Sequence, residues 1–255
     1  MSGGVFDVVV VGGGAAGLMC ALRAGQRGRR VLVLDHAEKV GKKILISGGG
    51  RCNFTNLEAR PEAYLSANPH FCKSALARYT QHDFIALVDR HRIAWHEKTL
   101  GQLFCDGSAR QIVAMLLAEC AAAGVDVRTG HRITAIEKSD RFSVHADRGD
   151  FQSSAVVLAT GGLSIPKMGA TGFAHDVARR FGLAVTETRP ALVPLTLGTA
   201  PELSGVSLDV VARCGRASFR EAMLFTHRGL SGPAILQVSS YWREGREIAI
   251  DLLPG

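Results

Sequence analysis

The sequence predicts an α/β fold of the doubly wound, Rossmann-like type. Residues 5–11 form a β-branched run of strand length whose pattern is that of a strand buried on both faces. A glycine-rich turn at 12–17 and a helix-forming stretch at 18–24 follow directly, and residues 31–34 form a second apolar strand. Strand, turn, helix and strand together occupy about 30 residues, which is the length of a dinucleotide-binding unit.

The composition fits a globular chain with a sizeable core. Of the 255 residues, 47% are hydrophobic and 21% are charged, and the mean hydropathy is +0.13. These values exclude intrinsic disorder, collagen and a coiled coil as the main architecture. The 30 basic and 23 acidic residues give a net charge of +7. A solvated basic surface explains this excess, which also permits an anionic partner such as nucleic acid or a dinucleotide.

The sequence predicts a cytoplasmic protein without a membrane span. Its first residues lack the basic region of a signal peptide. The most apolar run, 8–22, is too short and too rich in glycine to cross a bilayer. The six cysteines include no C-x-x-C pair and no zinc-like spacing with histidine. We therefore expect reduced core thiols and no metal site.

Periodicity and breaking residues predict the remaining elements of the first part of the chain. Residues 61–95 are expected to form a small helical segment. A further helix should run from an N-cap at Ser108 to about Ala123, followed by a strand at 125–128. Residues 131–152 alternate and turn, which predicts an antiparallel meander, and residues 155–159 form another buried strand.

The composition changes after Pro190. Short strand-like runs at 191–197, 208–213 and 247–252 are separated there by glycine and proline. We therefore expect the N-terminal part of one domain at 1–190, with its small helical segment at about 60–95. Residues 191–255 are expected to begin a second, β-rich domain.

The first candidate site is the G-x-G-x-x-G pattern at Gly12, Gly14 and Gly17. Its glycines allow a tight turn, close approach to a pyrophosphate and close packing of the helix, whose N-terminus favours phosphate. Asp35 lies 18 residues after Gly17, at the end of the second strand. A carboxylate there accepts hydrogen bonds from a ribose diol and disfavours a 2′-phosphate. The alternative is a purely structural glycine turn.

The second candidate site is the polar loop that contains three consecutive glycines, Gly48, Gly49 and Gly50. Such a run is costly to order and is expected where backbone passes close to a ligand. Arg51, Lys42 and Lys43 can neutralise phosphate, while Asn53 offers a donor and an acceptor to a flavin ring or ribityl chain. A flexible surface loop is the alternative. Cys52 is a candidate redox thiol and equally a packed one.

Two further segments are weaker candidates. Thr160, Gly161 and Gly162 close a buried strand at its carboxyl end, where doubly wound sheets bind ligands. His227 precedes a turn-rich run, and a structural role is the simpler interpretation of a lone histidine. The hydrolase and kinase signatures G-x-S-x-G and P-loop lysine do not occur. No residue is assigned as a catalytic acid or base, and His227 and Cys52 stay candidates only.

Four stretches together resemble a known family. They are 8–21 (VVVVGGGAAGLMCA), 41–56 (GKKILISGGGRCNFTN), 159–182 (ATGGLSIPKMGATGFAHDVARRFG) and 224–237 (LFTHRGLSGPAILQ). The combination looks like the bacterial aminoacetone-oxidase-family FAD-binding proteins, also known as NAD(P)/FAD-dependent oxidoreductases. The second and fourth stretches are far more specific than the glycine fingerprint, and the resemblance runs from about residue 5 to the end of the chain.

The resemblance implies a two-dinucleotide-binding-type FAD domain, interrupted by an inserted β-rich domain and a small helical piece. It implies that the FAD pyrophosphate is held by one group of residues, Gly12, Gly14, Ala15, Ala16 and Gly17. Asp35 would bind the adenosine ribose, and the backbone of Ile133 would meet adenine. The flavin side would be lined by Lys43, Ser47, Gly48, Gly49, Gly50, Arg51, Cys52 and Asn53. The cofactor would be closed over by Ala159, Thr160, Gly161 and Gly162.

The resemblance also implies an FAD-dependent oxidoreductase, in which the flavin carries the hydride or electron chemistry. Its substrate is left open between small molecules (amine oxidation or reduction of enone-like compounds) and a uridine in ribosomal RNA that is reduced to dihydrouridine. The dinucleotide fingerprint occurs only once, so the sequence does not support a separate NAD(P)H site. Transient reduction of the flavin by NAD(P)H stays open. Relatives continue beyond the point that matches Gly255, so the chain resembles a C-terminally truncated form. An RNA-binding protein with a vestigial flavin site and an inactive fragment are the other two hypotheses.

Overall fold

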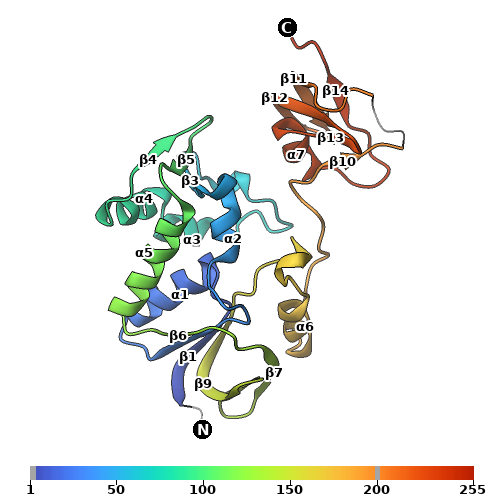
Figure 1. Cartoon of the computed structure of the whole chain (residues 1–255). Helices are drawn as coiled ribbons and strands as arrows, with labels where there is room; N and C mark the ends of the chain where they lie inside the picture. The colour runs from blue at the N-terminus through green and yellow to red at the C-terminus, as the bar shows by residue number, and fades with distance from the viewer. Residues whose placement is uncertain (1–3, 199–201) are drawn as a thin grey trace. The chain divides into compact units, whose positions relative to one another are not determined.

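The computed structural model describes residues 4–198 and 202–255 (Figure 1). The chain divides into two compact units, Met1–Ala184 and Val185–Gly255. This division lies a few residues before the boundary that the composition predicts at 190. That residues 191–255 begin an inserted domain stays a prediction.

A six-stranded sheet is the centre of the first unit. Its order is β6-β2-β1-β9-β8-β7, in which β6, β2, β1 and β9 are parallel neighbours and β8 and β7 are antiparallel. The strands are β1 (Val5–Val11), β2 (Val31–Leu34), β6 (Asp126–Arg128), β7 (Ile133–Lys138), β8 (Phe142–Ala146) and β9 (Gly149–Leu158). The parallel half is the Rossmann-like fold that the sequence predicts.

Both faces of this sheet are covered, as the apolar run of β1 requires. Val10 points into a core that contains α1 (Ala15–Gly25) and α5 (Ala109–Ala122). Val9 and Val11 point into the opposite core, which includes residues of β7, β8 and β9 and Val177 of α6 (Phe173–Arg180). The α1 and α5 ribbons lie together beside the sheet in Figure 1. Because α1 packs on this sheet, its N-terminus is fixed at the carboxyl end of β1.

The structure corrects the sequence prediction at β9. The predicted meander ended at 152 and a separate strand began at 155, whereas the structure has one strand from Gly149 to Leu158. Phe151 and Ser153 are buried while Gln152 and Ser154 are exposed, so the alternation continues through the presumed break. The strand pairs with β8 through its first half and with β1 through most of its length, and these two partners keep it continuous.

A second, three-stranded sheet accompanies the main one in the first unit. Its order is β3-β5-β4, from Asn53–Asn56, Gln102–Cys105 and Trp95–Glu97. The other elements of this region are α2 (Lys42–Ile46), η1 (Ser47–Gly50), η2 (Pro61–Ala63), α3 (Lys73–Arg78) and α4 (Gln81–Arg90). The stretch 61–95 is thus several short elements. Pro69 lies between η2 and α3, and a capping box at Thr80 and Asp83 starts α4 anew.

The second unit is a five-stranded antiparallel sheet with one helix. The strand order is β10-β13-β12-β11-β14. The elements are β10 (Leu195–Thr196), β11 (Ser207–Cys214), β12 (Ala217–Thr226), β13 (Gly229–Ser231), α7 (Pro233–Ser239) and β14 (Ala249–Asp251). Ala234, Ile235 and Val238 of α7 are buried against Val210 and Met223 of the sheet.

In the part of the chain that the structure describes, no helix combines the length and apolarity needed to cross a bilayer. The same residues contain no cluster of three or more His, Cys, Asp or Glu side chains arranged to hold a metal ion.

Candidate functional site

Two glycines of the fingerprint are required by packing. Gly12 has a φ of 111°, and a Cβ there would collide with the carbonyl oxygen of Ala159. A Cβ on Gly17 would collide with the carbonyl oxygen of Gly12. Both clashes are with backbone, which has no rotamer to relieve them. These glycines let α1 approach the ends of β1 and β9.

Gly14, in contrast, is not explained by packing. It has ordinary backbone angles (φ −82°, ψ −172°), and a Cβ there would meet no described heavy atom within 4 Å. It is the N-cap of α1, and the first α-type bond of the helix runs from the Leu18 N–H to the Gly14 oxygen. The amides of the first turn therefore lack partners within the helix. Exposed Ala15 and Ala16 occupy this turn, so small residues surround an open helix N-terminus of the kind that binds phosphate.

Asp35 fastens the glycine turn to the end of β2. Its Oδ2 accepts a hydrogen bond from the Gly13 N–H at 2.7 Å, and its Oδ1 accepts one from the Ala37 N–H at 2.8 Å. A carboxylate has about four lone-pair positions, so it still has acceptor capacity for a ribose diol. The sequence predicts the carboxylate but not its bond to Gly13.

Ile133 is brought to the same side of the sheet by the chain just before it. The His131 N–H donates to the Asp35 oxygen at 2.9 Å, and the Gly130 N–H donates to the Ala37 oxygen at 2.9 Å. Ile133 follows as the first residue of β7. Ile133 therefore follows a segment that is bonded to Asp35, the residue expected to bind the adenosine ribose. Contact of the Ile133 backbone with adenine stays a prediction.

The second loop has an unusual backbone. Gly48, Gly49, Gly50 and Cys52 have φ values of 57°, 65°, 86° and 53°. A Cβ on Gly48 would lie 2.6 Å from Cε1 of Phe104, whereas one on Gly49 would meet no described atom within 4 Å. Gly48 is thus explained by packing, while Gly49 faces open space as Gly14 does.

Hydrogen bonds hold the ends of this loop. The Ser47 hydroxyl donates to the Ile44 oxygen at 2.7 Å, and the Cys52 N–H donates to the Ser47 oxygen at 3.0 Å. Arg51 and Asn53 are exposed beside them. The loop is therefore a turn tied by hydrogen bonds, with two exposed polar side chains beside it.

The structure favours the packed interpretation of Cys52. Its side chain is buried, and burial raises the pKa of its thiol, against a smaller lowering by the hydrogen bond with Ser47. Burial, and then the neighbouring Cys52, raise the pKa of Cys105 to about 11. Both thiols are protonated at neutral pH, and the thiol form is a poor nucleophile.

The three candidate segments meet at the carboxyl ends of β1 and β9. The Gly41 N–H, just before α2, donates to the Gly13 oxygen at 2.9 Å. Two residues further, the Lys43 ammonium donates to the Ser164 hydroxyl at 3.0 Å, which joins α2 to the segment after β9. The Thr160 hydroxyl in that segment is buried and has no hydrogen-bond partner among the described residues.

This arrangement fits a dinucleotide. It offers an open helix N-terminus and a nearby ammonium for phosphates, a carboxylate for ribose, and an orphaned buried hydroxyl that a bound group would satisfy. Ser164 and Gly13 belong to it, although the sequence analysis did not select them. His227 lies exposed in the turn between β12 and β13 of the second unit and stays a candidate only.

Comparison with known proteins places the chain in a family. A family model described as the HI0933-like protein Rossmann domain matches residues 6–230. The chain belongs to the HI0933-like family. Its fold is therefore the Rossmann-type, FAD-binding α/β fold, accompanied by additional sheets. This is the fold class that the sequence predicts. The match supports this family and does not specifically support the aminoacetone-oxidase group named by the resemblance.

Three curated relatives of the chain have names that describe activities. The chain is 53% identical over 98% of its length to the ribosomal RNA dihydrouridine synthase of Escherichia coli (strain K12). It is 48% identical over 96% of its length to the protein of the same name from Haemophilus influenzae. It is 30% identical, again over 96% of its length, to the 3-dehydro-bile acid delta(4,6)-reductase of Clostridium scindens. In each case the chain spans 64% of the length of the relative.

Proposed function

We propose that this chain is the flavin-binding part of an FAD-dependent oxidoreductase. The observation that carries the proposal is the open N-terminus of α1 at Gly14, which packing within the protein does not explain. Gly12 and Gly17 bring that helix end to the sheet, and Asp35 fixes the turn. When bound, FAD supplies hydride or electron transfer.

The residues that would hold FAD fall into three groups, according to the part of the cofactor that each group contacts. The pyrophosphate would be held by the glycine turn and the first residues of α1, namely Gly12, Gly14, Ala15, Ala16 and Gly17. Asp35 would accept from the ribose, and Ile133 would offer its backbone to adenine. The flavin side would be held by Lys43, Ser47, Gly48, Gly49, Gly50, Arg51, Cys52, Asn53, Ala159, Thr160, Gly161 and Gly162.

We propose a uridine in ribosomal RNA as the substrate. The support is the 53% and 48% identity to two ribosomal RNA dihydrouridine synthases over nearly the whole chain. Uracil has a C5=C6 bond conjugated to the C4 carbonyl, and its reduction adds a hydride to C6 and a proton to C5. NAD(P)H is the proposed source of electrons, by transient reduction of the flavin.

Reduction of a small enone is the second candidate. The supporting observation is the 30% identity to a 3-dehydro-bile acid delta(4,6)-reductase. The name of that relative describes double bonds conjugated to a ketone, and the C5=C6 bond of uracil is likewise conjugated to a carbonyl group. Both candidates are alkene reductions activated by a carbonyl. Because the relatives with these names are the similar ones, we propose alkene reduction ahead of the amine oxidation expected for an aminoacetone oxidase.

The test compares a strain that lacks the gene of the full-length protein with the same strain carrying that gene on a plasmid. Total ribosomal RNA from that strain should lose one dihydrouridine, detected by mass spectrometry of nucleosides and oligonucleotides. Plasmid expression of the wild-type gene should restore it, and expression of the Gly14→Ala variant should restore less. Unchanged dihydrouridine in the deletion strain would refute the RNA substrate. An anaerobic assay with a conjugated ketosteroid would then decide whether the second candidate holds.

A further inference from the structure

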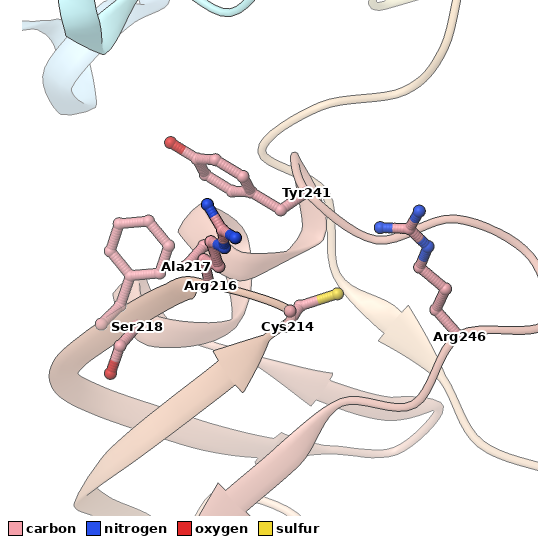
Figure 2. Close-up of a pocket in the computed structure, with 8 residues that line it drawn as sticks. Cys214, Arg216, Ala217, Ser218, Tyr241 and Arg246 are labelled. Carbon is pink, nitrogen blue, oxygen red and sulfur yellow. The ribbon is translucent and has the colours of Figure 1, made fainter.

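A hollow of about 470 Å³ lies at one end of the sheet in the second unit (Figure 2). Residues far apart in the chain line it: Arg216 from the turn between β11 and β12, Phe219 from β12, Tyr241 just after α7, and Arg246 ahead of β14. Its volume falls within the range of about 300–1,000 Å³ typical of ligand sites. None of these residues was selected by the sequence analysis.

One wall of the hollow is aromatic. The ring centroids of Phe219 and Tyr241 are 5.6 Å apart and their planes are inclined by 44°. Both residues are half-buried, pack in part against the core of the unit and line the hollow. Figure 2 shows the Tyr241 ring reaching outward from the chain after α7. Half-exposed aromatic rings of this kind are the surfaces on which nucleic-acid bases stack.

The charged groups of the hollow are two exposed arginines. Among the described residues, neither Arg216 nor Arg246 lies within ion-pair distance of a carboxylate. The lining contains no acidic residue. Residues 185–255 contain seven arginines and seven acidic residues, so the unit as a whole is neutral. The hollow is therefore a local concentration of positive charge. Both of its charged residues are arginines, whose guanidinium groups bind phosphate and also stack on aromatic rings.

The backbone that carries these side chains is held in place. Gly215 has a φ of 58° and forms, with Arg216, the tight turn between the paired residues Cys214 and Ala217. The Trp242 indole N–H donates to the Arg246 backbone oxygen at 2.7 Å. In Figure 2 the arginines lie on opposite sides of Cys214. The site is thus largely formed before a ligand arrives.

We infer that this hollow docks one nucleotide of a single-stranded RNA segment. The base stacks on Tyr241 beside Phe219, and the flanking phosphates lie against Arg216 and Arg246. An acidic peptide would satisfy the arginines but leave the aromatic wall unused. The inference rests on the proposed function only in taking RNA as the polymer, and it assigns part of RNA binding to a place outside the flavin segments.

The experiment measures RNA affinity of the full-length flavoprotein by fluorescence anisotropy with a short fluorescein-labelled oligouridylate. The double variant Arg216→Gln/Arg246→Gln should bind about tenfold more weakly, since each lost contact is a solvated charge pair. Its plot of log affinity against log salt should be shallower by about 1.4, which is about 0.7 for each lost phosphate contact on a single strand. Arg213→Gln is the matched control. Arg213 is exposed on β11, on the opposite sheet face from Cys214, and its loss should change neither quantity.

Two variants of Tyr241 test stacking separately from charge. Tyr241→Leu should weaken binding about tenfold, within the range for loss of one stacked base, while Tyr241→Phe should bind like the wild type. If Tyr241→Leu does not fold, the arginine pair decides. The inference is overturned if the double variant binds the RNA as tightly as Arg213→Gln does. It is also overturned if a polyglutamate peptide of equal charge competes as well as unlabelled RNA.

The flavin content of each variant separates the two proposals. Normal flavin absorbance with unchanged RNA affinity in the double variant would refute the docking site and leave the proposed function standing. If the protein makes no dihydrouridine but the double variant still binds RNA more weakly than the wild type does, the docking site stands. That result would confirm that docking occurs apart from the flavin chemistry. If the wild-type protein carries no flavin and the double variant still binds RNA about tenfold more weakly than the wild type, the proposed function alone is refuted.

Discussion

Replacing Gly14 by alanine separates binding of the cofactor from stability of the fold. The backbone angles at Gly14 suit any residue, and the added methyl group would meet no described atom within 4 Å. Alanine is a poorer N-cap than glycine, which costs up to about 1 kcal/mol. The melting temperature without FAD should therefore fall by no more than about 2–4 °C.

The effect on FAD should be much larger. The methyl group would occupy the space in which the pyrophosphate approaches the first turn of α1. Forcing an atom into a filled space costs about 1–3 kcal/mol, which corresponds to a Kd weaker by about 5- to 150-fold. The apo form of the full-length protein is titrated with FAD, and quenching of flavin fluorescence reports binding.

Two companion variants make the comparison specific. Gly17→Ala places its methyl group against the Gly12 carbonyl oxygen, so the apo protein itself should lose about 1–3 kcal/mol. Gly172→Ala makes the same change at the N-cap of α6, where the nearest atom is Asp176 Oδ2 at 3.6 Å. It should resemble Gly14→Ala in stability and the wild type in FAD affinity. An undiminished FAD affinity in Gly14→Ala would refute the assignment of this helix end to the pyrophosphate.

Three other variants or measurements test separate parts of the structure. Asp35→Ala leaves two backbone N–H groups without their acceptor, so the apo protein should lose about 1–3 kcal/mol in urea unfolding, and an unchanged unfolding midpoint would contradict this. Cys52 should resist iodoacetamide at pH 8 in the native protein and react in urea, because burial raises its thiol pKa, and rapid native labelling in a mass spectrum would contradict it. The hydrogen bond from His91 is the main cause that lowers the pKa of Glu119, so its stabilisation is present above the ordinary carboxyl pKa and disappears as the pH falls through the lower folded value. Glu119→Gln should therefore have a lower urea midpoint than the wild type at pH 7 and an equal one in acid, and a constant difference at all pH values would contradict this.

Local signals made the first site predictable. The fingerprint from Gly12 to Gly17 follows its strand directly, and Asp35 lies at the end of the next strand, so all parts belong to one short β-α-β unit. The sequence could not distinguish the reasons for the three glycines. Gly12 and Gly17 are required by backbone contacts, while packing does not explain Gly14. That difference depends on the distance between α1 and Ala159, which only the packed sheet sets.

Non-local pairing explains what the sequence analysis missed. The strands of the small sheet have three or four residues, and β3 pairs with β5 through a register shift between Asn53 and Thr55. Such short strands carry no clear alternation. The hollow of the second unit has the same origin. Arg216 and Arg246 come together because β11 pairs with β14, and neither residue has a distinctive neighbourhood in the sequence.

A visible absorption spectrum of the purified full-length protein, with its Gly14→Ala variant alongside, tests the central claim most directly. The account predicts flavin bands in the wild type, release of FAD on denaturation, and bands that are weak or absent in the variant at equal protein concentration. A wild-type protein that is colourless, and that stays so after incubation with FAD and removal of the excess, would contradict the assignment of these glycine-rich segments to a flavin site.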